Sequence, residues 1–135
     1  IFHYASVANW KPIREIDHVI RNFVDIGIAV TVHDNVEDIF PLIDEKVVDF
    51  VQVMGIEHIG YQGEPFTYEC LDIIEAIRKR YPEIIISIDG GVSADSIPAL
   101  RDAGVDRFVS GSSVFGQGLA SENVEYLRDI AEGRE

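Results

Sequence analysis

The chain is 135 residues long and has 24 acidic against 11 basic side chains, for a formal net charge of −13. This length suits one domain, residues 1–135, built around one core. A negative electrostatic field repels nucleic-acid phosphates and anionic lipids, and no apolar stretch approaches the ~20 residues that span a bilayer. We therefore expect neither a nucleic acid nor a membrane as a partner. The single cysteine, Cys70, cannot form an internal disulfide and favours a cytoplasmic location.

Five short runs rich in β-branched residues predict strands. They are IFHY at 1–4, IAVTV at 28–32, FVQVM at 50–54, IIISI at 84–88 and RFVSG at 107–111. Most are nearly continuously apolar rather than alternating, which is typical of strands covered on both faces in a parallel sheet.

Helical patterns lie between these runs. Ile13, Ile16, Ile20 and Phe23 have helical spacing and predict a first helix with a buried apolar face, capped at its end by Gly27. The later predictions are a helix over 36–45 capped by Asn35, a helix through Leu71, Ile74 and Ile77 that ends before Pro82, a helix from a Ser93 cap to Gly104, and a helix over 122–132 that buries Val124, Leu127 and Ile130.

The predicted order of elements is strand and helix in alternation, five times over. Such alternation predicts an α/β fold with a parallel sheet and right-handed crossovers. A closed eight-unit barrel needs about 250 residues, so five units are too few to close one, and a doubly wound sheet is the structural alternative.

Three predicted loops at strand ends are rich in glycine. They are GIEHIGYQGEPF at 55–66, DGGV at 89–92 and SGSSVFGQG at 110–118. Glycine lets backbone N–H groups approach an anion, and a following helix N-terminus adds unpaired N–H groups, so these loops predict a site for a small phosphate group. The first loop has Glu57 and Glu64 but no lysine or arginine, so N–H groups would hold the phosphate, with His58 as a helper. The alternative is that the glycines only make tight turns.

Asp89 ends an apolar strand directly before two glycines. A desolvated carboxylate in such a place is paired, bound to a metal or poised as a base, and the alternative is a helix cap or a turn aspartate. His3, His33 and His58 each follow a predicted strand, so a metal cluster of these histidines with Asp89 is a further alternative.

Several motifs, in this order, resemble the ribulose-phosphate 3-epimerase family. They are VQVM at 51–54 with GYQGE at 60–64 for strand 6, IDGGV at 88–92 for strand 7, and SGSSVFG at 110–116 for strand 8; GIAVTV at 27–32 and FHYAS at 2–6 are similar to strands 5 and 4. The resemblance implies a partial (β/α)8 TIM barrel of the ribulose-phosphate-binding type. Residues 1–135 would form its C-terminal portion, with strands 4 to 8.

The resemblance also implies an activity, which is epimerisation at C3 of a ketopentose phosphate, ribulose 5-phosphate to xylulose 5-phosphate. The family uses a divalent metal ion (Zn, Fe, Mn or Co) and two aspartates as acid and base. Asp89 would be both a metal ligand and one of these two groups. The residues implied to line the phosphate and sugar pocket are Gly60, Tyr61, Gln62, Gly63, Gly90, Gly91, Gly111 and Ser112. The other ligands and the second aspartate would lie before Ile1, so we expect an incomplete site.

The first loop departs from the family pattern. Residues 57–59, EHI, replace an N-P pair, Gln62 replaces a glycine and Glu64 replaces a glutamine, which makes the edge of the site larger and more acidic. The alternatives to an epimerase are another phosphosugar-barrel enzyme (a decarboxylase, aldolase or synthase) and a catalytically silent phosphate-binding domain. The open sheet edges favour a homo-oligomer.

Overall fold

The computed structural model describes residues 1–61 and 63–134, which form one five-stranded parallel sheet in the order β1-β2-β3-β4-β5. The strands are β1 (Phe2–His3), β2 (Gly27–Val30), β3 (Phe50–Met54), β4 (Ile85–Asp89) and β5 (Arg107–Val109). All five predicted strands are therefore confirmed. Because each strand pairs with its neighbour in sequence, the sheet has no point at which the strand order reverses. This excludes the doubly wound alternative and agrees with part of a barrel wall.

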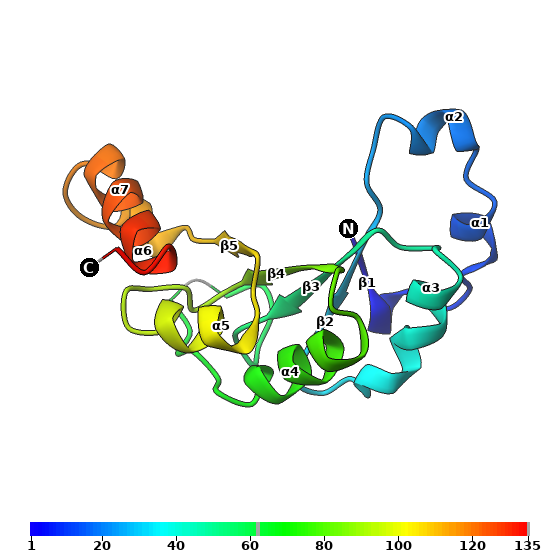
Figure 1. The fold of residues 1–135 in the computed structure, drawn as a ribbon, viewed down its shortest axis with the longest axis horizontal. Helices are drawn as coiled ribbons and strands as arrows, with labels where there is room; N and C mark the ends of the chain where they lie inside the picture. Colours follow the sequence, from blue (N-terminus) through cyan, green and yellow to red (C-terminus); the bar gives the residue numbers. More distant parts are fainter. Residues whose placement is uncertain (62, 135) are drawn as a thin grey trace.

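Helices lie between the strands and after β5. They are the 3-10 helices η1 (Tyr4–Ser6) and η2 (Val36–Ile39), and the α-helices α1 (Lys11–Arg14), α2 (His18–Arg21), α3 (Phe40–Asp44), α4 (Cys70–Arg80), α5 (Ile97–Ala103), α6 (Ser112–Phe115) and α7 (Ala120–Ala131). In the view of Figure 1, α4 and α5 lie below the sheet, α6 and α7 lie at one end, and α1 and α2 lie at the other. No helix within the described ranges is long and apolar enough to cross a membrane.

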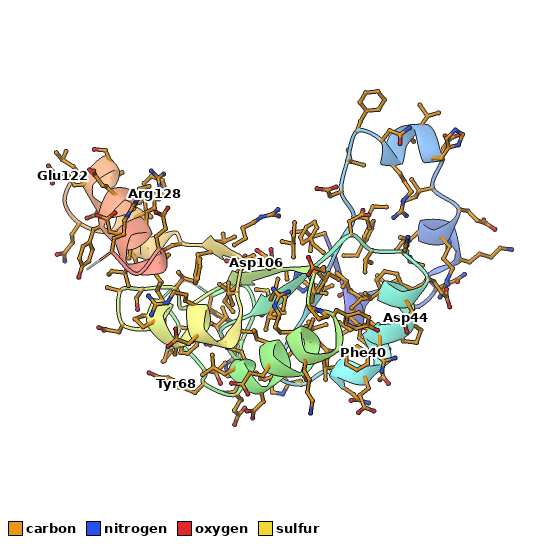
Figure 2. All side chains as sticks on the ribbon, viewed as in Figure 1. Phe40, Asp44, Tyr68, Asp106, Glu122 and Arg128 are labelled. Carbon is orange, nitrogen blue, oxygen red and sulfur yellow. The ribbon has the colours of Figure 1, made fainter. Side chains whose placement is uncertain are left out.

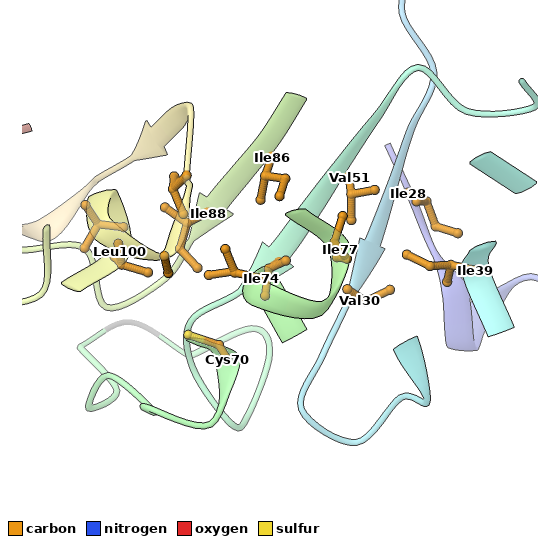
Figure 3. Close-up of a cluster of buried hydrophobic side chains, with 14 of the residues drawn as sticks. Ile28, Val30, Ile39, Val51, Cys70, Ile74, Ile77, Ile86, Ile88 and Leu100 are labelled. Carbon is orange, nitrogen blue, oxygen red and sulfur yellow. The ribbon is translucent and has the colours of Figure 1, made fainter. Parts of the chain in front are cut away.

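The core lies between the sheet and the helices on one of its faces. Strand side chains that point to this face are fully buried: Ile28, Val30, Val51, Val53, Ile86 and Ile88. They meet Ile74 and Ile77 of α4 and Leu100 of α5 (Figure 3). Since side chains alternate along a strand, the intervening residues point to the opposite face, and several of these are polar, as in Gln52, Ser87 and Asp89.

Arg78 of α4 links four segments of the chain. Its guanidinium donates to the carbonyl oxygens of Ile84 at 2.8 Å and Gly104 at 2.7 Å. It also pairs at 2.5 Å with the carboxylate of Asp106, which lies directly before β5 (Figure 2). The same Asp106 carboxylate accepts a hydrogen bond from the backbone N–H of Ile86 at 2.8 Å. One side chain therefore satisfies polar groups at the starts of β4 and β5 and at the end of α5.

Most of the helix predictions are confirmed. Helix α4 ends before Pro82 and buries Ile74 and Ile77, and α7 buries Leu127 and Ile130, whereas Val124, which was also predicted to be buried, is exposed. Gly104 ends α5 in the left-handed conformation with φ of 107°. The Asn35 side chain accepts a hydrogen bond from the N–H of Glu37 and caps η2, although the predicted helix over 36–45 is divided into η2 and α3.

The prediction of one continuous first helix is wrong. The segment forms two four-residue helices, α1 and α2, because the Asp17 side chain accepts a hydrogen bond from the N–H of Val19 and starts a new helix. Only the first part of the predicted apolar face packs on the core: Ile13 is buried and Ile16 contacts the core, whereas the Ile20 and Phe23 side chains are 54% and 83% exposed. Gly27 does not cap this helix but opens β2, where a Cβ atom would lie 2.3 Å from the ring of Phe50.

The prediction that Ser93 caps the next helix is also wrong, because α5 begins later, at Ile97. The Ser96 hydroxyl accepts a hydrogen bond from the N–H of Ser93 at 2.9 Å and donates to the carbonyl of Gly91 at 2.8 Å. The serines therefore stabilise a turn that precedes the helix.

We expect Arg78→Ala to lower the free energy of unfolding by about 2–4 kcal/mol, because Asp106 and several carbonyls lose a charged donor in partly buried surroundings. Urea unfolding followed by circular dichroism measures this loss. The matched control is Lys79→Ala, on the next, exposed position of α4, which should change the free energy by less than about 0.5 kcal/mol. Equal effects of the two substitutions would contradict the structural role of Arg78.

Candidate functional site

The carboxyl ends of β3, β4 and β5 lie next to one another at one edge of the sheet. The parallel register pairs Met54 with Asp89 and Asp89 with Val109. The three glycine-rich loops leave the sheet at these positions and surround a hollow of about 430 Å³. Since ligands bind at the carboxyl ends of strands in α/β folds of this kind, this hollow is the candidate site.

The structure brings the predicted site residues together. Those that line the hollow are Gly60, Tyr61 and Gly63 from the first loop, Asp89, Gly90 and Gly91 from the second, and Gly111 and Ser112 from the third. Gln62 lies outside the described residues. The placement of the residues that line the hollow agrees with a common site. The role of each of these residues stays a prediction.

Direct hydrogen bonds fix the loops around the hollow. The N–H of Gly55 donates to the carbonyl of Asp89 at 2.8 Å, which joins the start of the first loop to β4. The hydroxyls of Ser110 and Ser113 both donate to the carbonyl of Val92, at 3.0 and 2.8 Å, which joins the third loop to the second. The hollow is therefore a built feature of the fold and not a gap between independent loops.

The turn explanation accounts for four of the five predicted site glycines, because Gly60, Gly63, Gly90 and Gly91 all have a positive φ. Gly90 and Gly91 have φ of 97° and 68°, values that other residues rarely adopt. A Cβ atom on Gly91 would also lie 2.9 Å from the backbone of Phe66. These two residues must be glycine for the chain to turn, whatever the hollow binds.

Gly111 is different. Its φ is −105°, which any residue adopts, and a Cβ atom there would meet no other atom within 4 Å. Neither backbone strain nor crowding requires glycine at this position. Gly111 lines the hollow and directly precedes α6, whose first N–H groups have no partner inside the helix. A bare backbone here leaves these N–H groups open to a ligand.

Asp89 is partly buried, and Gln52 is its side-chain partner among the described residues of the site. The Gln52 amide nitrogen lies 3.4 Å from Oδ2 of Asp89 and 3.8 Å from the sulfur of Met54. Gln52 and Met54 also line the hollow, and neither is among the predicted site residues. The signal was present, because Gln52 interrupts the apolar run of β3 and points to the same face as Met54, two positions away.

The hollow has acidic but no lysine or arginine side chains among the described residues that line it. Asp89 and Glu64 supply the carboxylates, and His3 supplies an imidazole whose Nδ1 is buried and has no hydrogen-bond partner within the described part of the chain. The groups that these residues offer to an anion are main-chain N–H groups and the His3 imidazole, whereas His58, the expected helper, pairs with Glu64 and lines an adjoining crevice.

The described residues do not by themselves fit a metal centre. Across residues 1–61 and 63–134, no group of three or more histidine, cysteine, aspartate or glutamate side chains could hold a metal ion. The alternative cluster of histidines is not formed, since His58 pairs with Glu64 and His33 is exposed. Cys70 is fully buried, and burial raises the pKa of its thiol to about 11, so the thiol packs as an apolar group and is no nucleophile.

Several solved structures have similar folds. The thiamine phosphate pyrophosphorylase of Pyrococcus furiosus matches with a TM-score of 0.67 and 20% identity, over 98% of this chain and 58% of its own. A 3-hexulose-6-phosphate synthase matches with a TM-score of 0.67 and 18% identity, over 91% of this chain and 57% of its own. At such identities the likeness concerns the fold alone, which is that of a partial (β/α)8 barrel.

Sequence comparisons identify the family. The model of the ribulose-phosphate 3 epimerase family matches residues 1–115. The cytoplasmic isoform of ribulose-phosphate 3-epimerase from Oryza sativa subsp. japonica is 34% identical over 134 residues, which are 98% of this chain and 58% of the relative. The ribulose-phosphate 3-epimerase of Schizosaccharomyces pombe is 33% identical, over 95% of this chain and 54% of the relative. The chain thus spans a little over half the length of these curated relatives, and it belongs to the ribulose-phosphate 3-epimerase family.

Proposed function

We propose that this chain forms the phosphate-binding part, and one acid–base group, of an isomerase that inverts C3 of a ketopentose phosphate, converting ribulose 5-phosphate to xylulose 5-phosphate. One observation supports this proposal above the others. Three glycine-rich loops and Asp89 meet in a single hollow at the carboxyl ends of neighbouring strands, in a chain of this family.

The phosphate group would lie against the backbone N–H groups of the second and third loops. Gly111 supports this placement, since its lack of a side chain has no explanation in the fold itself. The start of α6 beside it presents N–H groups without intrahelical partners. Such groups bind an oxyanion without any basic side chain, which suits a chain with a net charge of −13.

Asp89 would transfer the proton at C3. Its carboxylate takes the proton from C3, and the electron pair of the broken C–H bond moves to the neighbouring C2 carbonyl, which gives an enediolate. Return of a proton to the opposite face of C3 restores the ketone with inverted configuration. The Gln52 amide, 3.4 Å from Oδ2, would orient the carboxylate and leave Oδ1 free to accept the proton.

Inversion needs a second acid–base group on the other face of C3, and the family also implies a divalent metal. Asp89 is the one member of the implied metal and acid–base set on these five strands, and the described residues contain no metal cluster. No step is therefore assigned to a metal. Coordination by Asp89 remains a proposal that requires further ligands from elsewhere in a closed barrel, of which residues 1–135 would be the C-terminal portion.

A catalytically silent phosphate-binding domain is the second candidate. It is supported by the glycine-rich loops of the hollow, which would bind a phosphate group without any acid–base chemistry. Other phosphosugar-barrel chemistries share the same loops, and fold likeness alone does not separate them. We also propose a cytoplasmic location, in line with the named isoform of the rice relative, and, for the 135-residue chain by itself, association into a homo-oligomer through its edge strands β1 and β5.

We expect inorganic phosphate at millimolar concentration to shift the backbone amide signals of Gly91, Gly111 and Ser112 in a nuclear magnetic resonance titration. Gly111→Ala should weaken this binding by about tenfold, because a methyl group would stand in front of the N–H groups. The urea unfolding midpoint of the variant should match that of the original chain, since a Cβ atom meets no neighbour there. Amide signals that do not move would count against the phosphate site.

We further expect the 135-residue chain to show no turnover of ribulose 5-phosphate in an assay coupled to xylulose 5-phosphate consumption, because reprotonation lacks its second group. In a whole protein that contains this chain, Asp89→Asn should lower kcat by about 10²–10⁴-fold while phosphate binding persists. Robust turnover by the 135-residue chain alone would refute the division of roles proposed here.

A further inference from the structure

Two buried side-chain atoms have no hydrogen-bond partner within the described part of the chain, Oγ of Ser87 and Nδ1 of His3. Ser87 lies in the middle of β4 and is only 1% exposed. A buried hydroxyl without a partner destabilises a fold, and in folded proteins such a group is nearly always paired with another protein group or with an ordered water. The Ser87 hydroxyl therefore requires an explanation.

The register of the sheet places both atoms in one row of side chains. Ser87 of β4 is the direct partner of Gln52 of β3. The row continues through Ala29 of β2 to His3 of β1. Neighbouring strands lie ~4.8 Å apart, and side chains at paired positions point to the same face. Gln52 thus has an unpaired polar group directly on one side and a second one, beyond the small side chain of Ala29, on the other.

Gln52 connects this row to the carboxylate of Asp89. Its amide nitrogen donates to Oδ2 at a long distance of 3.4 Å and lies 3.8 Å from the sulfur of Met54, which is a weak acceptor. Contacts this weak leave the orientation of the amide poorly fixed. The oxygen Oε1 of the same amide only accepts hydrogen bonds, and the hydroxyl of Ser87 on the next strand is a donor.

We propose that Ser87 is a positioning residue, whose hydroxyl donates to an ordered water that in turn donates to Oε1 of Gln52. This bridge fixes the amide with its nitrogen toward Asp89. A water is required, because Oγ of Ser87 reaches no other described residue directly although Gln52 lies on the adjacent strand. The hydrogen bonds then run in one direction from Ser87 to Asp89, and each one polarises the next.

The inference rests on the proposed function in one respect, namely that Asp89 transfers the proton at C3. The water bridge itself does not depend on any activity. It can therefore be tested both in the 135-residue chain and in a whole protein that contains this chain.

The first test observes the side-chain amide of Gln52 by nuclear magnetic resonance in the 135-residue chain. We expect cross-relaxation between this amide and a bound water in the original chain, and its loss in Ser87→Ala. Hydrogen exchange of the amide should become faster by at least about threefold in the variant. The urea unfolding midpoint should fall, because a bridged hydroxyl stabilises the fold, whereas removal of an unpaired hydroxyl would raise it.

Ser96→Ala is the matched control. Ser96 is also a buried serine, 3% exposed, but its hydroxyl donates to the carbonyl of Gly91 outside the row. This variant should lower the unfolding midpoint and leave the signals of the Gln52 amide unchanged.

The second test measures epimerisation by the whole protein. Ser87→Ala and Gln52→Leu should each lower kcat by about tenfold and leave KM for ribulose 5-phosphate within about twofold, because both act on Asp89 and not on the phosphate group. The double variant should fall no more than about twofold below either single variant, since both substitutions remove the same support.

The outcomes separate the inference from the proposed function. Unchanged signals of the Gln52 amide in Ser87→Ala, or a higher unfolding midpoint, would overturn the water bridge and leave the proposed function in place. Signals that change in His3→Ala but not in Ser87→Ala would overturn it in favour of His3. Losses of kcat that multiply in the double variant would also contradict it. An inactive whole protein would refute the proposed function, and the amide signals would still decide whether the bridge exists.

Discussion

The site depends on the parallel register of β3, β4 and β5, which brings Met54, Asp89 and Val109 to one edge of the sheet. Parallel strands end at the same edge of the sheet, so the loops that follow them lie close together even before they contact one another. The backbone bond between Gly55 and Asp89 and the two serine hydroxyls on Val92 then fix the distances between the loops. A change of register in β4 by one residue would turn Asp89 away from the hollow and place an apolar side chain in it.

The sequence predicts the positions of the strands better than the positions at which the helices begin. The strands were predictable because their apolar β-branched runs need burial wherever they lie, and Gly104 was predictable because a helix end in the left-handed conformation favours glycine. The first helix was not predictable in its full length. The spacing of Ile20 and Phe23 indicates an apolar helix face, but it does not show whether the sheet extends far enough for that face to pack on it. Asp17 caps a second helix in this segment, the Ser96 hydroxyl bonds to a turn before α5, and spacing alone predicts neither contact.

The same limit applies to the site. The glycine loops and Asp89 could be named from their positions after predicted strands. Gln52 stands out as a polar residue in an apolar strand, but its approach to Asp89 could not be predicted, because that contact joins neighbouring strands and depends on their register. The structure also separates glycines that the sequence treats alike, since Gly91 is required by its backbone angle whereas Gly111 is not. The contact between Glu64 and His58 likewise depends on the path of the loop, which composition does not determine.

The order of the strands has a consequence for how the chain acquires its structure. Every strand pairs with the one that precedes it, so the entropy lost in closing each connection is that of a single loop and helix. Folding can therefore advance by successive addition, each new repeat using the last one as a template, with no distant segment needed to start. An architecture assembled in this way can lengthen or shorten by whole repeats while the repeats already in place keep their internal packing.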